Sequence, residues 1–520
     1  MNRLKRKFVF LALLTALAVF WSGPSWAADL YLRGYLETDL RMGIGGKKDR
    51  PPGVEEYRFL RNENTARITT SMGTGDVQAV FDGSIVYEGF PRATTMQGLT
   101  SREDVDPVRM ESEALYLEIF DFLPSVDLRL GRQVMKWGSA DIFNPTSVLN
   151  PYDLEDPIKF GEAIATEMAT MRWSAPWYIE GEDEAIFEEL SLTLAAVPIF
   201  RPGMLPDSAL YAFTESTVFE RYANTQTLLD LIQLQKAYEE GGGNILFDLG
   251  VEPPDASLKN MQYGARVGWT LMGIDMGLMA YQGFDDIARA ERVKANAPRR
   301  DPNSLSESAG KALTGIPDPL QDIDATMEVV NTIPSYEGYD VLTEIQLTFP
   351  RVQVIGADFS ASLESLGGLG IWAEAAMTFH DALYRSIRYA DYPYYIEREA
   401  NKDAFVKVTA GMDYSITNWW YTNIQYVHGF VDEFGKENLK DYIVAGADFK
   451  LFQEKVLVRL FGISQLQDKS FLLFPQLTLD YWQDTKIALG GLIFGGAADS
   501  KFGGRETGSN TIFLRGRYSF

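Results

Sequence analysis

The chain contains no cysteine and only two histidines in 520 residues. Without cysteine there is no disulfide framework and no thiol chemistry. His380 and His428 are too few for a histidine-rich metal centre. No phosphate-binding loop, nucleophile elbow or zinc-protease motif occurs either. The adjacent His380 and Asp381 could form an Asp–His pair, but a histidine in a polar rim loop is the simpler interpretation. We therefore predict no enzyme activity, no metal and no cofactor.

Basic residues are also scarce compared with acidic ones. The chain has 48 Lys and Arg and 72 Asp and Glu, which gives a net charge of −24. Nucleic acid is excluded as a natural partner, since the phosphate backbone needs a basic footprint. Long apolar runs are missing after the N-terminus, so no membrane-spanning helix is expected, which would need about 20 such residues.

The first residues have the pattern of a secretory leader. A basic start is followed by an apolar run from Phe8 to Trp21, which Gly23-Pro24 ends. Ser25-Trp26-Ala27 then supplies small residues where a signal peptidase cuts. We predict a signal peptide over 1–27, cleaved after Ala27, and a single domain over 28–520.

Segments of about ten residues with alternating apolar and polar side chains recur from residue 30 to residue 520, a pattern typical of transmembrane β-barrels. In 30–41, leucines share one face, while Arg33, Glu37 and Asp39 share the other. The sequence predicts an all-β, antiparallel transmembrane barrel of about 16–18 strands. Its apolar face would meet lipid and its charged face would line a lumen. A barrel of this kind places the chain in the outer membrane of a Gram-negative cell.

Short and long connections alternate along the chain. The short ones are predicted to be periplasmic turns and the long ones external loops, two of them about sixty residues long. A soluble domain rarely tolerates unstructured loops beyond about 12–15 residues. One long loop also contains a leucine-rich helical pattern near 228–234. The predicted external loops are 42–56, 90–108, 138–163, 200–258, 285–349 and 383–400.

The last ten residues, TIFLRGRYSF, form an amphipathic strand that ends on an aromatic residue. This ending resembles the C-terminal signal of bacterial outer-membrane proteins, and the resemblance implies that Tyr518 and Phe520 are recognised by the barrel-assembly machinery. The last strand would pair with the first and so remove the free sheet edges.

The charged face supplies the candidate lumen-lining residues. Two interpretations remain open: basic and acidic rows across a water-filled pore, which would set its selectivity, or ion pairs that hold a plugged lumen rigid. The candidates are Arg33, Glu37, Arg129, Arg266, Glu374, Lys407, Asp413, Asp448, Arg459, Arg515 and Arg517.

A proline-punctuated segment after the fifth strand is the candidate constriction. Asn-Pro pairs restrict the backbone and lower the entropy of a loop. Such a stiff loop could fold into the lumen, or it could be an ordered surface loop. Its candidate residues are Asn144, Pro145, Asn150, Pro151 and Asp153.

Two motifs carry a family resemblance. Gly131-Arg132-Gln133-Val134, then Trp137-Gly138 and the two Asn-Pro pairs, resemble large porin-like outer-membrane proteins of proteobacteria, a group of unsettled function often placed with alginate-export-type barrels. The stretch 349–360 is also similar to theirs, with Asp358 where a serine is usual. The resemblance implies a barrel that passes a solute, and family members are suspected of handling hydrophobic compounds or polymers.

The sequence thus favours a porin-like channel for diffusion or export of a small or polymeric solute. The alternatives are a plugged, structural or receptor barrel, or an outer-membrane enzyme. An iron-chelate receptor is disfavoured, because its plug would precede the first strand and a strand begins at residue 30. Expected partners are membrane lipid, lipopolysaccharide bridged to the acidic loops by divalent cations and, for export, an inner-membrane exporter.

Overall fold

The computed structural model describes most of the chain after the predicted signal peptide. The leader (1–27) and the leucine-rich pattern near 228–234 lie outside the described residues. In the described part, no helix is both long and apolar enough to cross a bilayer. The described residues are 29–44, 57–159, 161–176, 179–180, 185–206, 245–295, 341–389, 395–497, 499–504 and 510–520.

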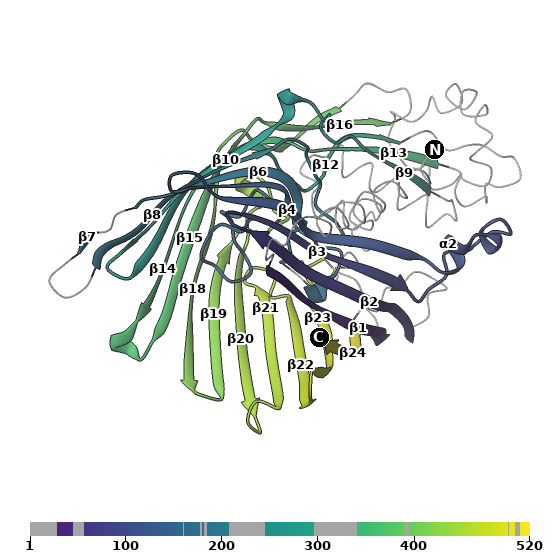
Figure 1. Ribbon diagram of the computed structural model, residues 1–520. Coiled ribbons are helices and arrows are strands. Elements are labelled where there is room, and N and C mark those ends of the chain that lie inside the picture. The colour runs from purple at the N-terminus through teal and green to yellow at the C-terminus, as the bar shows by residue number, and fades with distance from the viewer. Residues whose placement is uncertain are drawn as a thin grey trace, which may run out of the picture.

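A closed antiparallel barrel dominates the molecule (Figure 1). The described residues contain nineteen strands in its sheet, and the two-residue β7 (Ile179–Glu180) pairs only with β8, so 19 − 1 = 18 strands form the ring. These are β1 (Asp29–Ile44), β2 (Tyr57–Thr74), β3 (Val77–Glu88), β4 (Val108–Leu123), β5 (Val126–Gln133), β6 (Thr166–Ser174), β8 (Ala185–Val197), β10 (Gln262–Leu271), β11 (Ile274–Phe284), β14 (Arg351–Leu363), β15 (Leu369–His380), β18 (Phe405–Thr417), β19 (Trp420–His428), β20 (Asp441–Leu451), β21 (Val456–Gln465), β22 (Phe471–Trp482), β23 (Thr485–Gly495) and β24 (Thr511–Ser519).

The predicted transmembrane barrel is confirmed, with strand limits mostly within a few residues of those read from the sequence. Short turns join the strands at one end, as expected. At one of them, Met272 and Gly273 both have positive φ, 50° and 73°. A two-residue hairpin turn of this hand follows the twist of its strands, and glycine adopts that conformation without strain.

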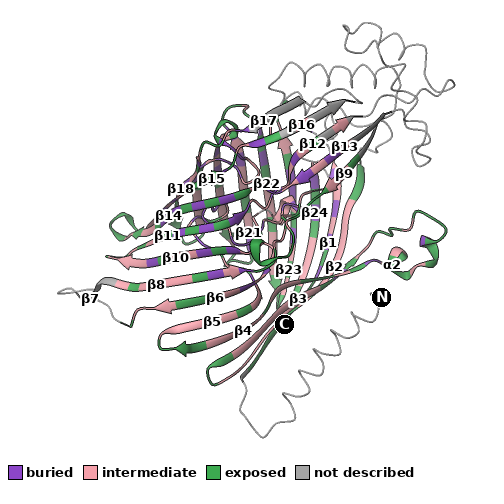
Figure 2. Cartoon of the chain, turned by 90° about the horizontal axis from the view of Figure 1, so that it is seen from above, coloured by how far each residue is buried: buried purple, intermediate pink, exposed green. Residues whose placement is uncertain are grey.

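Burial alternates along the strands (Figure 2). On β14, Val352 and Val354 are buried on the inner face, whereas Ile355 is 59% exposed on the outer face. On β1, Leu32 is exposed and Glu37 is buried. Large apolar side chains left exposed on the outer face need a lipid environment, because water would penalise them.

The outward direction of Val458 can be tested on β21. Its neighbour Arg459 faces inward and pairs with Asp448, so Val458 lies on the lipid face, as Leu32 and Val408 do. Val458→Arg is expected to cost about 2–4 kcal/mol if the site is near the bilayer midplane. Urea unfolding in lipid vesicles would measure this cost. Arg459→Lys is the control, and an unchanged stability of Val458→Arg would show that the register of β21 is wrong.

The ring closes between β1 and β24, which pair antiparallel from Tyr35–Ser519 to Gly43–Thr511. The last residue extends this pairing, since Phe520 N donates to Gly34 O and Gly34 N donates to Phe520 O, both at 2.9 Å. Tyr518 and Phe520 point outward and are exposed. Recognition by the assembly machinery remains a prediction.

Deletion of Phe520 should lower the yield of folded barrel, because it removes the terminal aromatic and the last two closing hydrogen bonds. The amount of exported precursor should not change. Heat-modifiable gel mobility of isolated outer membranes measures the folded fraction, and Phe359→Ala, on the outer face of β14, serves as a control for loss of an aromatic. An undiminished folded yield would contradict the prediction.

A second sheet lies in segments that the sequence had assigned to loops, and those assignments (200–258, 285–349 and 383–400) are wrong in part. Its order is β17-β16-β12-β13-β9. Its strands continue the barrel strands β10, β11, β14, β15 and β18 beyond the loop end of the barrel (Figure 1). They are β9 (Ile245–Val251), β12 (Arg289–Ala295), β13 (Val341–Thr348), β16 (Leu383–Tyr389) and β17 (Tyr395–Ala400).

We call this second sheet the extension. Relative to the barrel strands that they continue, its strands β12 and β13 have exchanged places. Barrel strand β11 lies between β10 and β14, but its continuation β12 lies between β13 and β16. The exchange makes β13 parallel to β9 and β12 parallel to β16. The chain therefore crosses itself at 285–288 and 349–350, where Asp285 N donates to Pro350 O at 2.9 Å and Phe200 packs on both Phe284 and Phe349.

Helical structure in the described part is limited to short segments in the connections. They are α2 (Arg102–Val105) and the 3-10 segments η1 (Gly98–Thr100), η2 (Pro157–Lys159), η4 (Leu258–Asn260), η6 (Glu364–Leu366) and η7 (Lys436–Asn438).

Candidate functional site

The connection between β5 and β6, residues 134–165, is termed the inner loop. Its start and its end are held together by the buried amide of Asn150. Asn150 Nδ2 donates to the carbonyls of Gln133 and Ile164, both at 3.0 Å, and its Oδ1 accepts from Met135 N at 2.7 Å. One side chain thus satisfies three main-chain groups at the two ends of the loop, and it closes the base of the loop.

The other four candidate residues lie in the same folded loop. Asn144 Nδ2 donates to Ala140 O at 2.7 Å, and Pro145 follows it on the wall of a cavity. The carbonyl of the buried Pro151 accepts from Ile164 N at 2.8 Å. Asp153 Oδ1 accepts from Glu155 N at 3.0 Å, which fixes a local turn.

The inner loop contacts the barrel wall on widely separated strands. Thr146 Oγ1 donates to Glu374 Oε2 on β15 at 2.8 Å. Asp156 accepts from Nη1 and Nη2 of Arg41 on β1, at 2.6 and 2.7 Å. In the ring, nine strands separate β1 from β15 on one side and seven on the other. A segment that bonds both strands must cross the interior of the barrel.

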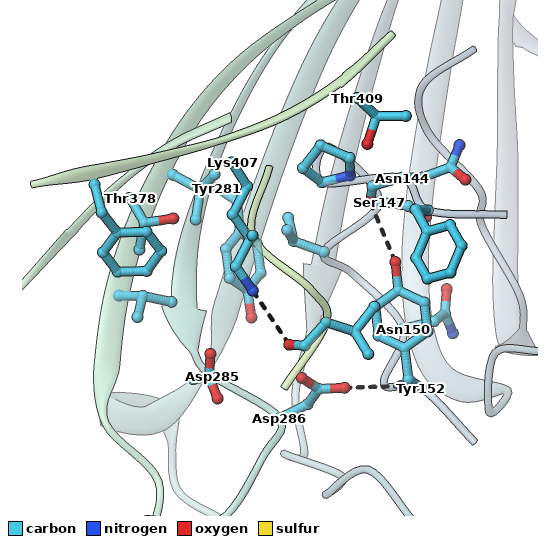
Figure 3. A pocket seen from close by; sticks show the side chains of 18 of the residues that line it. Asn144, Ser147, Asn150, Tyr152, Tyr281, Asp285, Asp286, Thr378, Lys407 and Thr409 are labelled. Carbon is cyan, nitrogen blue, oxygen red and sulfur yellow. Dashed lines mark hydrogen bonds between the residues drawn. The ribbon is translucent and has the colours of Figure 1, made fainter. Parts of the chain in front are cut away.

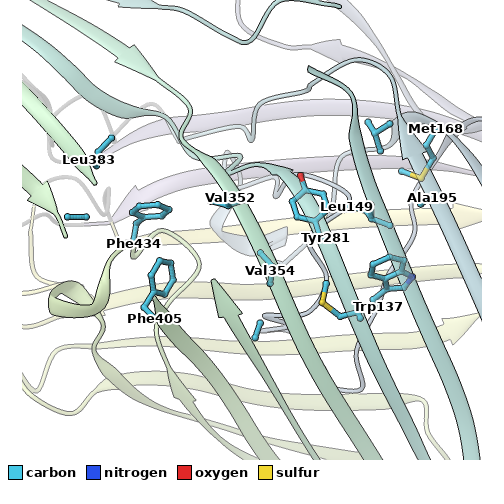
Figure 4. Close-up of a cluster of buried hydrophobic side chains, with 14 residues drawn as sticks. Trp137, Leu149, Met168, Ala195, Tyr281, Val352, Val354, Leu383, Phe405 and Phe434 are labelled. Carbon is cyan, nitrogen blue, oxygen red and sulfur yellow. The ribbon is translucent and has the colours of Figure 1, made fainter. Parts of the chain in front are cut away.

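Apolar contacts hold the loop on both flanks. Phe143 is 2% exposed and packs 5.0 Å from the ring of Phe430, in a cluster with inward residues of β19–β23 such as Tyr442. On the opposite flank, Trp137 and Leu149 belong to a cluster of buried side chains that also includes residues of β6, β8, β11, β14 and β18 (Figure 4). The inner loop is therefore packed into the barrel over much of its length.

Asp156 remains ionised in this setting. Burial alone would raise its pKa, but the hydrogen bonds and the charge of Arg41 outweigh burial and lower the pKa to about 2. Arg41 also binds Asp39, with Nη2 and Oδ2 at 2.7 Å. The guanidinium thus bridges a strand carboxylate and a loop carboxylate.

The candidate arginines of the wall pair with acids on nearby strands. Side chains on one face of adjacent strands lie about 5 Å apart, within reach of one another. The structure therefore places these charges side by side along the wall, rather than as a basic row across the lumen from an acidic row. The pairs are Arg129–Glu118 (2.7 Å), Arg266–Asp358 (2.7 Å), Arg459–Asp448 (2.6 Å), Arg515–Asp39 (2.8 Å) and Arg517–Glu37 (2.6 Å).

The remaining wall candidates have other surroundings. Arg33 is exposed near the turn end of β1 and lies over the ring of Tyr31. Asp413 accepts from the hydroxyl of Tyr421 at 2.9 Å. Lys407 Nζ donates to the carbonyls of Phe430 and Val431, at 2.8 and 3.2 Å.

A cavity of about 100 Å³ lies between the inner loop and the wall formed by β11, β14, β15 and β18 (Figure 3). Tyr152 N donates to Asp286 Oδ2 at 2.7 Å, and the Tyr152 hydroxyl donates to Asn144 O at 3.2 Å. Burial and the neighbouring Asp285 raise the pKa of Asp286 to about 6. The polar side chains around the cavity are Asn144, Ser147, Asn150, Tyr152, Tyr281, Asp285, Asp286, Thr378, Lys407 and Thr409.

Several residues of this site were not among the sequence candidates. Arg41 lies on the predicted charged face, but nothing in the sequence singles it out as the partner of Asp156. Phe143 and Thr146 fall within the Asn-Pro segment and could have been included on that signal. Asp285 and Asp286 fall at the start of a predicted loop, and no sequence signal identifies them.

The two histidines do not come together. His428 Nδ1 lies 2.8 Å from Asp441 Oδ1 on the next strand. His380 Nδ1 lies 2.7 Å from the backbone oxygen of Asp381, so this contact is with the main chain and not with the carboxylate. Among the residues that the structure describes, no group of three or more His, Asp or Glu side chains could hold a metal ion.

No protein-family model and no curated protein matches this chain. Among solved structures, a mutant of the Rh. blastica porin aligns with 95% of this chain and all of its own, at 9% identity and a TM-score of 0.35. The outer-membrane channel DcaP of Acinetobacter baumannii aligns over 95% and 97%, at 8% identity and 0.35. A loop-deletion mutant of OmpT, an outer-membrane protein of Vibrio cholerae, aligns over 95% and 100%, at 9% identity and 0.34. The grouping with alginate-export-type barrels remains a prediction.

Proposed function

We propose that the protein is a solute channel of the Gram-negative outer membrane, narrowed by its inner loop. The observation that carries this proposal is the path of the inner loop, which crosses the barrel from Arg41 on β1 to Glu374 on β15. A loop bonded to two sides of the wall restricts the lumen and brings polar groups close to a passing solute.

The exposure of the charged wall supports an open path beside the loop. The side chains of Arg459 and Arg129 are 46% and 30% exposed although both face inward and both are paired. In a fully packed lumen, charged side chains would have no contact with water. Water at these pairs is what a conducting lumen requires, and fixed charges there would act on permeating ions.

Single-channel conductance in planar bilayers tests the proposal. Arg459→Cys gives a second, independent measurement, because the chain has no native thiol. A small charged thiol reagent should modify position 459, and Leu460→Cys, on the lipid face, is the matched control. Absence of conductance in the unsubstituted protein, together with no labelling at 459, would rule out an open channel.

A plugged or receptor barrel is the second candidate function. The apolar packing of Phe143 against β19–β23 favours it, because such contacts exclude water and hold the loop in place. The conductance measurement separates the two candidates.

The partners are part of the proposal. Insertion would use the barrel-assembly machinery, and the acidic loops would bind divalent cations that bridge to lipopolysaccharide. Export of a polymeric solute would also need an inner-membrane exporter, whereas diffusion of a small solute would not. We propose no catalytic role.

A further inference from the structure

Charged groups of both signs line the cavity under the inner loop without pairing with one another. Lys407 Nζ donates to two main-chain carbonyls, and an ammonium group has a third hydrogen to donate. Asp285 and Asp286 line the same space. The ion pair of Asp285 is with Arg289, at 3.4 Å, and within the described residues no ion pair joins Lys407 to either aspartate.

Two buried polar atoms on residues that line the cavity also have no hydrogen-bond partner among the described residues. They are Oγ1 of Thr409, which is 1% exposed, and Oδ1 of Asn144, which is 3% exposed. Buried polar groups are nearly always hydrogen-bonded, because leaving one unpaired costs free energy. Figure 3 shows Thr409 and Asn144 on one side of the space and Asp285 and Asp286 on the other.

We propose that this cavity binds a small zwitterion, a compact solute with one primary ammonium group and one carboxylate. The ammonium group donates to the Asp285–Asp286 carboxylates. The carboxylate accepts from the remaining Lys407 hydrogen and from the Thr409 hydroxyl. The inference deepens the proposed channel function, on which it rests, by naming the class of solute that stops beneath the inner loop.

The charge of the lining distinguishes this class from neutral sugars or polyols. Arg289 already compensates the charge of Asp285, which leaves Lys407 and Asp286 as opposite charges with no ion pair within the described residues. A neutral polyol would hydrogen-bond here but would leave these two charges without an ionic partner, whereas a zwitterion compensates both signs. The volume of about 100 Å³ would hold several waters, each needing roughly 10–15 Å³ by this measure, and so limits the solute to a few heavy atoms.

Isothermal titration of the full-length barrel in detergent tests the inference. The probes are glycine, β-alanine and γ-aminobutyrate, whose charges lie progressively farther apart, with ethylamine, acetate and glycerol as controls. At least one zwitterion should bind about tenfold or more tightly than ethylamine, acetate or glycerol. Ethylamine has only the ammonium group, acetate has only the carboxylate and glycerol has neither, so each leaves a charge of the cavity unpaired.

Variants assign the binding to the cavity. Asp286→Asn retains an acceptor for Tyr152 N but removes the charge, and it should weaken zwitterion binding about tenfold or more. Lys407→Met should do the same. Thr409→Val, which keeps the side-chain shape, should weaken it less. Glu118→Gln, at an ion pair elsewhere on the wall, should leave the affinity unchanged. Heat-modifiable gel mobility confirms that each variant is folded.

Failure to bind any of the three zwitterions, or binding of glycerol with equal affinity, would overturn the inference. So would affinity unchanged by both Asp286→Asn and Thr409→Val. Conductance of the same preparation separates this inference from the channel function. Conduction without zwitterion binding rejects the binding site alone, and binding without conduction rejects the channel and retains the site.

Discussion

Arg41→Met is expected to lower the free energy of unfolding by about 3–5 kcal/mol, the cost of breaking a buried ion pair by removing one partner. Arg41 is 5% exposed and contacts Asp39 and Asp156, which are both buried. Methionine fills a similar volume, so the loss measures the charge and the hydrogen bonds rather than a cavity. Asp39 on the wall and Asp156 on the inner loop would remain, with one fewer cation between them.

The measurement is equilibrium unfolding in lipid vesicles, compared with Arg92→Met. Arg92 also pairs with a glutamate, Glu88, but its side chain is 61% exposed. An exposed pair of this kind is worth about 0–1 kcal/mol, so the control should be nearly neutral. Equal effects of the two substitutions would mean that the contact between β1 and the inner loop does not hold the loop in place.

Phe143→Ala is expected to raise single-channel conductance, and to cost about 3–5 kcal/mol as a large-to-small substitution in a packed cluster. Phe143 packs between the inner loop and β19–β23, in a cluster with Phe430 and Tyr442. Without its ring, the loop loses its apolar attachment on that flank, and the free cross-section of the lumen increases.

Conductance in planar bilayers and the size limit for sugars in liposome swelling measure this effect. Phe379→Ala is the matched control, since Phe379 lies on the outer face of β15 and is exposed. It should change neither quantity. Unchanged conductance and an unchanged size limit in Phe143→Ala would show that the loop does not restrict the lumen.

The barrel could be predicted from the sequence because lipid on one side and a polar lumen on the other impose strict alternation. On β1, the alternation alone places Leu32 on one face and Glu37 on the other, as the structure has them. Strand β12 of the extension gives no such signal. It has the sequence RAERVKA, and a bulge between Ala290 and Arg292 interrupts its alternation.

The site could be predicted only in its local part. The Asn-Pro pairs identify a stiff loop, since each restricts the backbone where it stands. The partners of that loop are long-range: Arg41 and Asp156 are 115 residues apart, and Thr146 and Glu374 are 228 apart. No periodicity links positions so distant, and the path of the loop through the barrel decides which of many charged residues meet.

The exchanged positions of β12 and β13 bear on the order in which the molecule folds. Many neighbouring barrel strands are joined by short turns, so their pairing needs only local loop closure. The parallel pair β9–β13 joins residues 245–251 to 341–347, and β12–β16 joins 292–295 to 386–389. Pairings with such large separations are slow to form, because a long stretch of chain must be ordered first. We therefore expect the five-stranded extension to form after β10, β11, β14 and β15 are aligned, so that a chain halted before that stage would carry a complete barrel wall with an unpaired rim.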